Sequence, residues 1–161
     1  MDISMKVIGI DPGQKGAIVL VEGSDVEYLL MPYVAKELDC RLIFQWIKDR
    51  SPDLVVLERQ LGMAGQGRTS IFSTAKSYGE LRAITEIIET PYLTPLPSQW
   101  TKQMLEGVPG KKGDKSRNIA ASRRLFPKVD MTPGRRVKPH DGIADALLLA
   151  EFGRRRLVGS K

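Results

Sequence analysis

Cysteine and histidine are nearly absent from this chain of 161 residues, which contains one of each, Cys40 and His140. A single cysteine excludes a disulfide within the chain, and it excludes a zinc site built from several cysteines. Because Cys40 lies far in sequence from His140, a small buried cysteine is a simpler interpretation than a catalytic nucleophile. A reducing cytoplasm is the compartment that fits this composition best.

Long apolar runs are also absent. No segment approaches the roughly 20 apolar residues needed to span a bilayer, so we expect no membrane partner. The N-terminus leads directly into a predicted strand and shows no signal-peptide pattern. Aromatic residues make up only 6% of the chain, but the hydrophobic content of 42% is ordinary for a globular protein. We therefore expect one domain over residues 1–161.

Charge is distributed unevenly between the two signs. The chain has 25 Lys and Arg against 19 Asp and Glu, which gives a formal net charge of +6. This balance favours a polyanionic partner, above all nucleic acid. A basic surface that is merely solvated remains the alternative.

The pattern of apolar residues predicts strands first and helices later. Alternating and β-branched runs, bounded by Gly and Pro, predict strands over residues 6–11, 16–22, 26–31, 54–57 and 91–94. Helical spacing predicts helices over residues 36–50, 70–89 and 115–126, another with Ser98 as N-cap, and a last one opened by Pro139. In the last helix, residues 144–152 form the apolar body, and we expect the basic tail 153–161 to fray.

This order of elements indicates an α/β fold with helices on both sides of a sheet. A right-handed crossover would place the strand of residues 54–57 beside that of residues 6–11. Asp11 and Glu58 end these two strands, and ligands of α/β sheets gather at such carboxyl ends. The sequence therefore predicts that the two carboxylates meet.

Each of these acids also has an ordinary interpretation. Asp11 begins an Asp-Pro-Gly sequence, and aspartate is common in turns. Glu58 follows four apolar residues, where an unpaired carboxylate is costly, so it could instead pair with Arg59 or another surface base.

A second pair of acids lies near the C-terminus. Asp141 and Asp145 are four residues apart and so share one face of a helix, where their like charges repel unless a cation offsets them. Asp141 could merely serve the helix terminus, and Asp145 could pair with a lysine or arginine. His140 is a candidate metal ligand or general base, or else an exposed residue at the terminus.

Acids of this kind suit hydrolysis of a phosphodiester. Two Mg²⁺ ions about 4 Å apart activate a water molecule and stabilise the leaving oxygen, and Mg²⁺ prefers oxygen ligands. We predict a site for two Mg²⁺ ions, which Mn²⁺ would replace, at Asp11, Glu58, Asp141 and Asp145.

Three motifs together resemble the RuvC-type Holliday junction resolvases, in particular their bacteriophage branch. They are GIDPG at residues 9–13, VVLERQ at residues 55–60 and PHDGIADALLLAEF at residues 139–152. The resemblance spans almost the whole chain. It implies an RNase H-like fold with a mixed five-stranded sheet and flanking helices, a homodimer, and metal-dependent nicking of two opposed strands of a four-way DNA junction. For a bacteriophage protein the compartment would be the cytoplasm of the bacterial host.

Carried over to this chain, the resemblance makes Asp11, Glu58 and Asp145 metal ligands. The family pattern has another acid or histidine three residues before the last aspartate, where this chain has Gly142. Asp141 or His140 would then complete the site, and Asp141 is favoured by its position on the face of Asp145. His140 or a water held by the metal would act as the base. Leu61 stands where cellular members have an aromatic wedge, so the wedge would be Leu61 or Phe72.

Basic residues near the predicted site are candidates for DNA contacts. The strongest, for phosphate near the scissile bond, are Lys102, Lys112 and Lys115. The others are Arg68, Lys76, Lys111, Arg117, Arg135, Arg136 and Lys138. Trp46, Trp100 and Tyr92 are more typical of a core than of base stacking.

Other functions remain open. A sugar-kinase or actin-like module also carries an Asp-x-Gly turn, but such proteins need two domains, and residues 107–112 lack the ending of a P-loop. We therefore expect no nucleotide cofactor. A DNA-binding protein without catalysis, and a less selective nuclease of flaps and forks, are the remaining alternatives.

Overall fold

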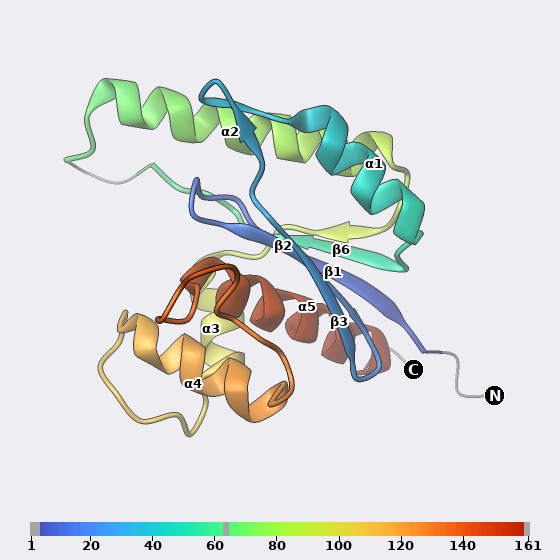
Figure 1. Cartoon of the computed structure of the whole chain (residues 1–161), viewed down its shortest axis with the longest axis vertical. Helices are drawn as coiled ribbons and strands as arrows, with labels where there is room; N and C mark the ends of the chain where they lie inside the picture. The colour runs from blue at the N-terminus through green and yellow to red at the C-terminus, as the bar shows by residue number, and fades with distance from the viewer. Residues whose placement is uncertain (1–3, 63–64, 160–161) are drawn as a thin grey trace.

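The computed structural model describes residues 4–62 and 65–159. At its centre is a mixed sheet of five strands in the order β3-β2-β1-β6-β7 (Figure 1). β1 pairs antiparallel with β2 and parallel with β6, and β7 is parallel to β6. The predicted mixed five-stranded sheet is therefore confirmed. The strands are β1 (Lys6–Asp11), β2 (Ala17–Glu22), β3 (Asp25–Leu30), β6 (Leu54–Leu57) and β7 (Tyr92–Leu93).

Helices cover both faces of this sheet (Figure 1). The two sides of β1 illustrate the division, because Ile8 and Ile10 belong to the core under α1 and α2, whereas Val7 belongs to the core under α5. On the second face of the sheet, which α5 covers, α3 and α4 pack against α5. The helices are α1 (Cys40–Arg50), α2 (Arg68–Ile87), α3 (Pro97–Met104), α4 (Lys115–Leu125) and α5 (Asp141–Gly159).

Glycines allow α5 to lie directly against the sheet. A Cβ atom on Gly9 of β1 would stand 2.1 Å from the carbonyl oxygen of Ala146, and one on Gly142 would stand 2.3 Å from that of Lys15. Real Cβ atoms do not approach oxygen so closely, so any side chain at either position would push the helix away. The spacing between α5 and β1 therefore depends on these two glycines.

The chain between β3 and α1 differs from the prediction. Residues 36–38 do not begin the helix, because β4 (Tyr33–Val34) and β5 (Glu37–Leu38) form a small hairpin. Ala35 and Lys36 make its turn with φ angles of 49° and 65°. Helix α1 starts only at Cys40, where Asp39 caps it by accepting the N–H of Leu42 at 3.0 Å.

Two helix starts also differ. Leu96, not Ser98, precedes the first residue of α3, and the Gln99 side chain accepts the Leu96 N–H at 2.8 Å. Helix α5 begins at Asp141 instead of Pro139, because the N–H of His140 donates to the carbonyl oxygen of Met131 at 2.7 Å. That bond links the two ends of residues 131–140, within the segment that connects α4 to α5.

The basic tail is helical as far as Gly159, and residues 160–161 lie outside the described part. Leu157 packs against the same core as the apolar body of α5, which favours continuation of the helix. Arg154 and Arg155 also pair with the buried Glu151, at 2.6 Å and 2.8 Å. No helix among the described residues combines the length and apolar character needed to cross a membrane.

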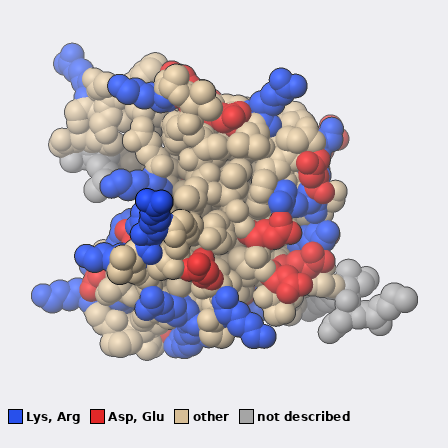
Figure 2. Space-filling model, viewed as in Figure 1, with Lys and Arg blue, Asp and Glu red and all other residues tan. Residues whose placement is uncertain are grey.

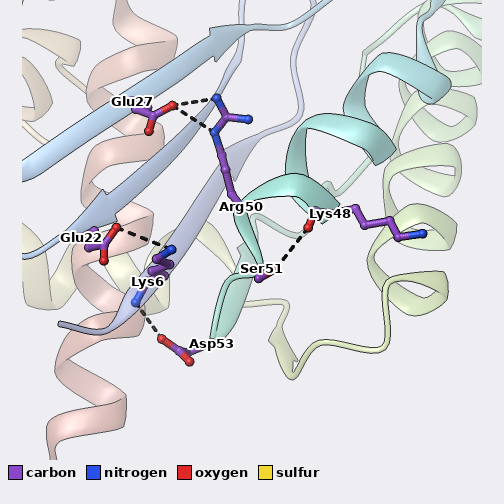
Figure 3. Close-up of polar contacts among 7 residues, drawn as sticks. All are labelled: Lys6, Glu22, Glu27, Lys48, Arg50, Ser51 and Asp53. Carbon is purple, nitrogen blue, oxygen red and sulfur yellow. Dashed lines mark hydrogen bonds and ion pairs between the residues drawn. The ribbon is translucent and has the colours of Figure 1, made fainter. Parts of the chain in front are cut away.

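Polar contacts join the elements near the amino end of β1 (Figure 3). Arg50 at the end of α1 lies 2.7 Å from Glu27 of β3, and the backbone N–H of Lys6 donates to Asp53 at 2.8 Å. Asp11 and Glu58 lie at the opposite ends of their strands, away from these contacts.

The close packing of α5 predicts a large effect of Gly9→Ala on stability. The added methyl group would overlap the α5 backbone, so we expect the free energy of unfolding in urea to fall by about 2 kcal/mol or more. Gly79→Ala is the control, because its Cβ would meet nothing within 4 Å. It should raise the free energy of unfolding by up to about 1 kcal/mol. Equal effects of the two substitutions would contradict this account of the helix position.

Candidate active site

Asp11 and Glu58 meet at one edge of the sheet, as the strand order predicted. Their preceding residues, Ile10 and Leu57, are paired in the parallel register of β1 and β6. The N–H of Glu58 donates to the carbonyl oxygen of Ile10 at 3.2 Å, which continues that register by one residue. The two carboxylates therefore leave adjacent strands side by side.

The turn after Asp11 fixes the first carboxylate and receives the start of α5. The N–H of Gly13 hydrogen-bonds to the Asp11 side chain, and the N–H of Gly16 donates to the Gly13 carbonyl at 2.7 Å. Gly142 of α5 packs against Lys15 and Gly16 in this turn. Asp145, one turn further along α5, is thereby brought to the edge of the sheet.

The three carboxylates influence one another strongly. Burial, followed by repulsion from Asp145 and Glu58, raises the pKa of Asp11 to about 7. Burial is also the main cause that raises the pKa of Glu58 and of Asp145. Lys115 at the start of α4 acts in the opposite direction on all three. The group is therefore anionic, partly buried and only incompletely compensated.

Two hydrogen-bond donors beside these acids were missed by the sequence analysis. Trp100 Nε1 donates to Glu58 Oε1 at 2.9 Å, and Asn118 Nδ2 donates to Asp145 Oδ1 at 2.6 Å. Trp100 is a core residue, as predicted, but its N–H faces the site. Both residues lie in helices remote in sequence from the acids, so no local pattern could have pointed to them. Arg59 donates to Thr94 and is not among the described groups that shift the pKa of Glu58, so the structure does not support the alternative pairing of Arg59 with Glu58.

Asp141 and His140 differ from these three acids in exposure and partners, although the charge of Asp141 still contributes to the raised pKa of Asp145. Asp141 is half exposed and lies 3.7 Å from the Nζ of Lys115, at the rim of the site. His140 is 7% exposed, and its Nδ1 has no hydrogen-bond partner in the described part of the chain. Burial, and then the positive charge of Arg136, lower the pKa of His140, although Asp141 opposes this. His140 is therefore held largely neutral.

Gly142 occupies the position where the sequence resemblance placed an acid or histidine. A side chain there would collide with the turn between β1 and β2, so no ligand could occupy the position three residues before Asp145. An additional acid on α5 must therefore stand elsewhere, and Asp141 occupies the adjacent position at the rim.

The donor set suits a hard divalent cation, although the side chains are not closed around one. Within residues 4–62 and 65–159, no three acidic, histidine or cysteine side chains stand close enough to hold a metal ion. The carboxylate oxygens are of the type that Mg²⁺ prefers, and a cation among them would relieve the repulsion that raises their pKa values. The side chains of Asp11, Glu58 and Asp145 would have to move to complete its coordination.

A cleft of about 800 Å³ opens beside Glu58 and Asp145. Lys102, Lys112 and Lys115, the strongest candidates for phosphate contacts, all line it. Arg117 lines it too, but its guanidinium donates to the carbonyl oxygens of Val108 and Leu105 at 3.0–3.2 Å. Arg117 thus holds the loop before α4 in place. Figure 2 shows Lys and Arg gathered over the part of the surface where α3 and α4 lie.

The other candidate DNA-binding residues lie outside this cleft. Lys76 is paired with Glu37 and Glu80 on the side of the sheet that α2 covers. Leu61 is 58% exposed and Phe72 71% exposed, near the amino end of α2. The remaining candidates, Arg68, Lys111, Arg135, Arg136 and Lys138, are exposed.

Comparison by sequence found nothing: no protein-family model matches, and neither does any curated protein. Comparison by structure did find matches. RuvC of Thermus thermophilus in complex with a Holliday junction has a TM-score of 0.68 and 15% identity, over 97% of this chain and 96% of that one. A second structure of the same protein has a TM-score of 0.63 and 19% identity, over 94% and 96%. The yeast mitochondrial Holliday junction resolvase has a TM-score of 0.58 and 17% identity, over 94% and 78%.

Each of these matches extends over nearly the whole of this chain, while the sequence identities remain low. What this chain shares with them is the arrangement of strands and helices over that length. The chain therefore has the RNase H-like fold of the RuvC-type Holliday junction resolvases.

The raised pKa of Asp11 makes stability depend on pH when no metal is bound. The folded chain binds this proton more tightly than the unfolded chain, so stability should decrease as the pH rises from about 4 to about 7. Glu58 and Asp145 act in the same direction. Asp11→Asn removes the titrating group. We expect the free energy of unfolding of this variant to exceed that of the wild type by about 1–3 kcal/mol at about pH 8. Near pH 4 the two values should be equal.

Urea unfolding in the presence of a chelator would measure this difference. Asp25→Asn, at an exposed position of β3, is the control. It should change the free energy of unfolding by the same small amount at both pH values. A stabilisation by Asp11→Asn that did not change with pH would contradict the electrostatic explanation.

Proposed function

We propose that this protein is a metal-dependent endonuclease that resolves four-way DNA junctions. The observation that carries the proposal is the group of three partly buried carboxylates, Asp11, Glu58 and Asp145, at the edge of a cleft lined by lysines. Acidic side chains alone would repel a phosphate backbone, whereas carboxylates combined with cations would attract it. The likeness to resolvase structures supports the same function.

The three carboxylates would hold Mg²⁺, or Mn²⁺ in its place, and Asp141 would contribute from the rim. When bound, two such ions supply activation of a water molecule and stabilisation of the leaving oxygen. The chain itself holds the ligands on rigid elements, because two of them end paired strands and the third lies on a helix packed against those strands. This rigidity lowers the cost of ordering the site.

His140 fits the role of a base better than that of a metal ligand. Its lowered pKa keeps the imidazole neutral at the pH of the cell, so that it is able to accept a proton. The charged groups that act on the pKa of His140 are Asp141, Arg136 and Lys115, and not the three partly buried acids. We therefore place it at the same rim of the site as Asp141.

The lysines of the cleft would hold the backbone beside the scissile phosphate. Lys102 comes from α3, and Lys112 and Lys115 come from the loop and first turn before the body of α4. Lys115 also offsets the charge of the carboxylates, so a phosphate would compete for it with Asp141. Contacts of this kind position a nucleic acid without reading its sequence.

A homodimer is part of this proposal, because two opposed strands require two sites related by a twofold axis. Helix α2 is our candidate interface. Its amino-terminal half is exposed, and the apolar side chains of Ile71 and Phe72 remain uncovered there. A second copy that covers them would remove this apolar surface from water.

Cleavage of a labelled four-way junction with Mg²⁺ tests the proposed activity. We expect paired nicks on opposed strands, and a decrease of about 100-fold or more in Asp11→Asn, because the variant loses a ligand charge without losing shape. Binding of the junction by Asp11→Asn in a chelator should be preserved. No nicking by the wild type, or full nicking by the variant, would refute the nuclease, and equal cleavage of flaps and forks would indicate the less selective enzyme.

The dependence of binding on salt tests the cleft. Lys112→Ala should weaken junction binding and reduce the slope of log K against log salt by about one, because one phosphate contact is lost. Lys48→Ala is the control, since Lys48 lies on α1 near the Phe44 ring and outside the cleft. Equal slopes for Lys112→Ala and the wild type would place the DNA elsewhere.

A further inference from the structure

The indole of Trp100 lies in the core and hydrogen-bonds to one of the three acids. The ring is 2% exposed and packs among the apolar residues under α5. An indole N–H is a donor only, so when buried it needs an acceptor. That acceptor is Glu58 Oε1, at 2.9 Å, from a strand end remote in sequence. The bond is therefore a tertiary contact between the core of the second face and the acidic group.

Asn118 makes the equivalent contact to the acid on α5. Its Nδ2 lies 2.6 Å from Asp145 Oδ1, and it projects from the first turn of α4, the helix packed beside α5. An ionised carboxylate only accepts hydrogen bonds, which fixes the orientation of the amide. Both Trp100 and Asn118 line the same cleft as the acids they contact.

We propose that Trp100 and Asn118 are positioning residues for the metal-binding carboxylates, an inference that rests on the proposed function. Each residue occupies one oxygen of its acid and leaves the second oxygen for a cation. Glu58 Oε2 has only a long contact of 3.4 Å from Gln60, and Asp145 Oδ2 has no partner among the described residues. The two donors thereby decide which oxygen faces the cleft.

Neutral donors suit this role better than cations. A lysine or arginine at the same distance would cancel the charge that attracts the metal ion and would compete for its place. The N–H groups of Trp100 and Asn118 orient the carboxylates and leave their net charge intact. Positioning partners of this kind commonly change metal affinity by about 10- to 100-fold.

The two donors also differ from the rest of the site in rigidity. Trp100 is enclosed by the core, and Asn118 is fixed by the packing of α4 on α5. Glu58, by contrast, follows a strand end and has three side-chain torsions to restrict. A bond to a fixed donor reduces the entropy that Glu58 loses when a metal ion binds. Asp11 receives the same kind of support from the Gly13 N–H.

Metal affinity in the absence of DNA tests this inference. Calorimetry with Mn²⁺ on the full chain should show affinity reduced about 10- to 100-fold in Trp100→Phe and in Asn118→Leu. Trp46→Phe and Gln103→Leu are the matched controls, because Trp46 packs on α1 beside Arg50 and Gln103 is exposed on α3. Both controls should bind Mn²⁺ as the wild type does.

A spectroscopic readout separates positioning from a general loss of structure. The chain has two tryptophans, so Trp46→Phe leaves Trp100 as the one energy donor when tryptophan is excited selectively over the four tyrosines. Tb³⁺ bound to that variant should emit when tryptophan is excited, because the ion and the indole would lie on either side of Glu58. Trp100→Phe should lose this emission, and in Asn118→Leu the emission should persist but require higher Tb³⁺ concentrations.

The outcomes distinguish this inference from the proposed function. If the wild type and controls bind Mn²⁺ and Asp11→Asn does not, but Trp100→Phe and Asn118→Leu bind within twofold of the wild type, the positioning role is refuted and the metal site stands. If the wild type binds no Mn²⁺, both fail. Should Trp100→Phe not fold by circular dichroism, Asn118→Leu and the Tb³⁺ emission of Trp46→Phe decide the question.

Discussion

The close contact between α5 and β1 is the constraint on which the rest of the structure depends. Gly9 and Gly142 remove the side chains that would separate helix from sheet, and the helix start then rests on the turn that follows Asp11. Asp145 reaches the edge of the sheet only because of this approach. The same helix buries nearly all of its residues between 142 and 153, so the packing that stabilises the second core also sets the geometry of the acids.

Electrostatics divides the site into two parts. Asp11, Glu58 and Asp145 are held together against their mutual repulsion by packing, by neutral donors and by the positive charge of Lys115. Asp141 and His140 form the other part, where Lys115 lies 3.7 Å from Asp141 and Arg136 acts on the pKa of His140. A fold that gathers buried anions beside a cleft lined by lysines is suited to bring metal ions and phosphate to the same place. The acids attract metal ions, which the lysines repel, and the lysines attract phosphate, which the acids repel.

Much of the fold and part of the site could be predicted from local patterns. The strand ends at Asp11 and Glu58 follow directly from apolar runs broken by turn residues, and their meeting follows from the handedness of crossovers. The start of α1 could not be predicted in this way, because a hairpin with left-handed residues at Ala35 and Lys36 replaced the first helical turn. Trp100 and Asn118 escaped detection because a partner remote in sequence leaves no periodic signal.

The sequence by itself determined which residues carry charge, where strands and helices lie and which acids end them, since these depend on local preference and on the period of apolar residues. The tertiary structure decided which acids share one environment, which oxygen of each is occupied and which basic residues face them. Arg117 illustrates the difference: its charge is visible in the sequence, but only packing shows that its guanidinium is turned toward the carbonyls of Leu105 and Val108. Distances between side chains depend on how whole elements pack, and no local pattern encodes them.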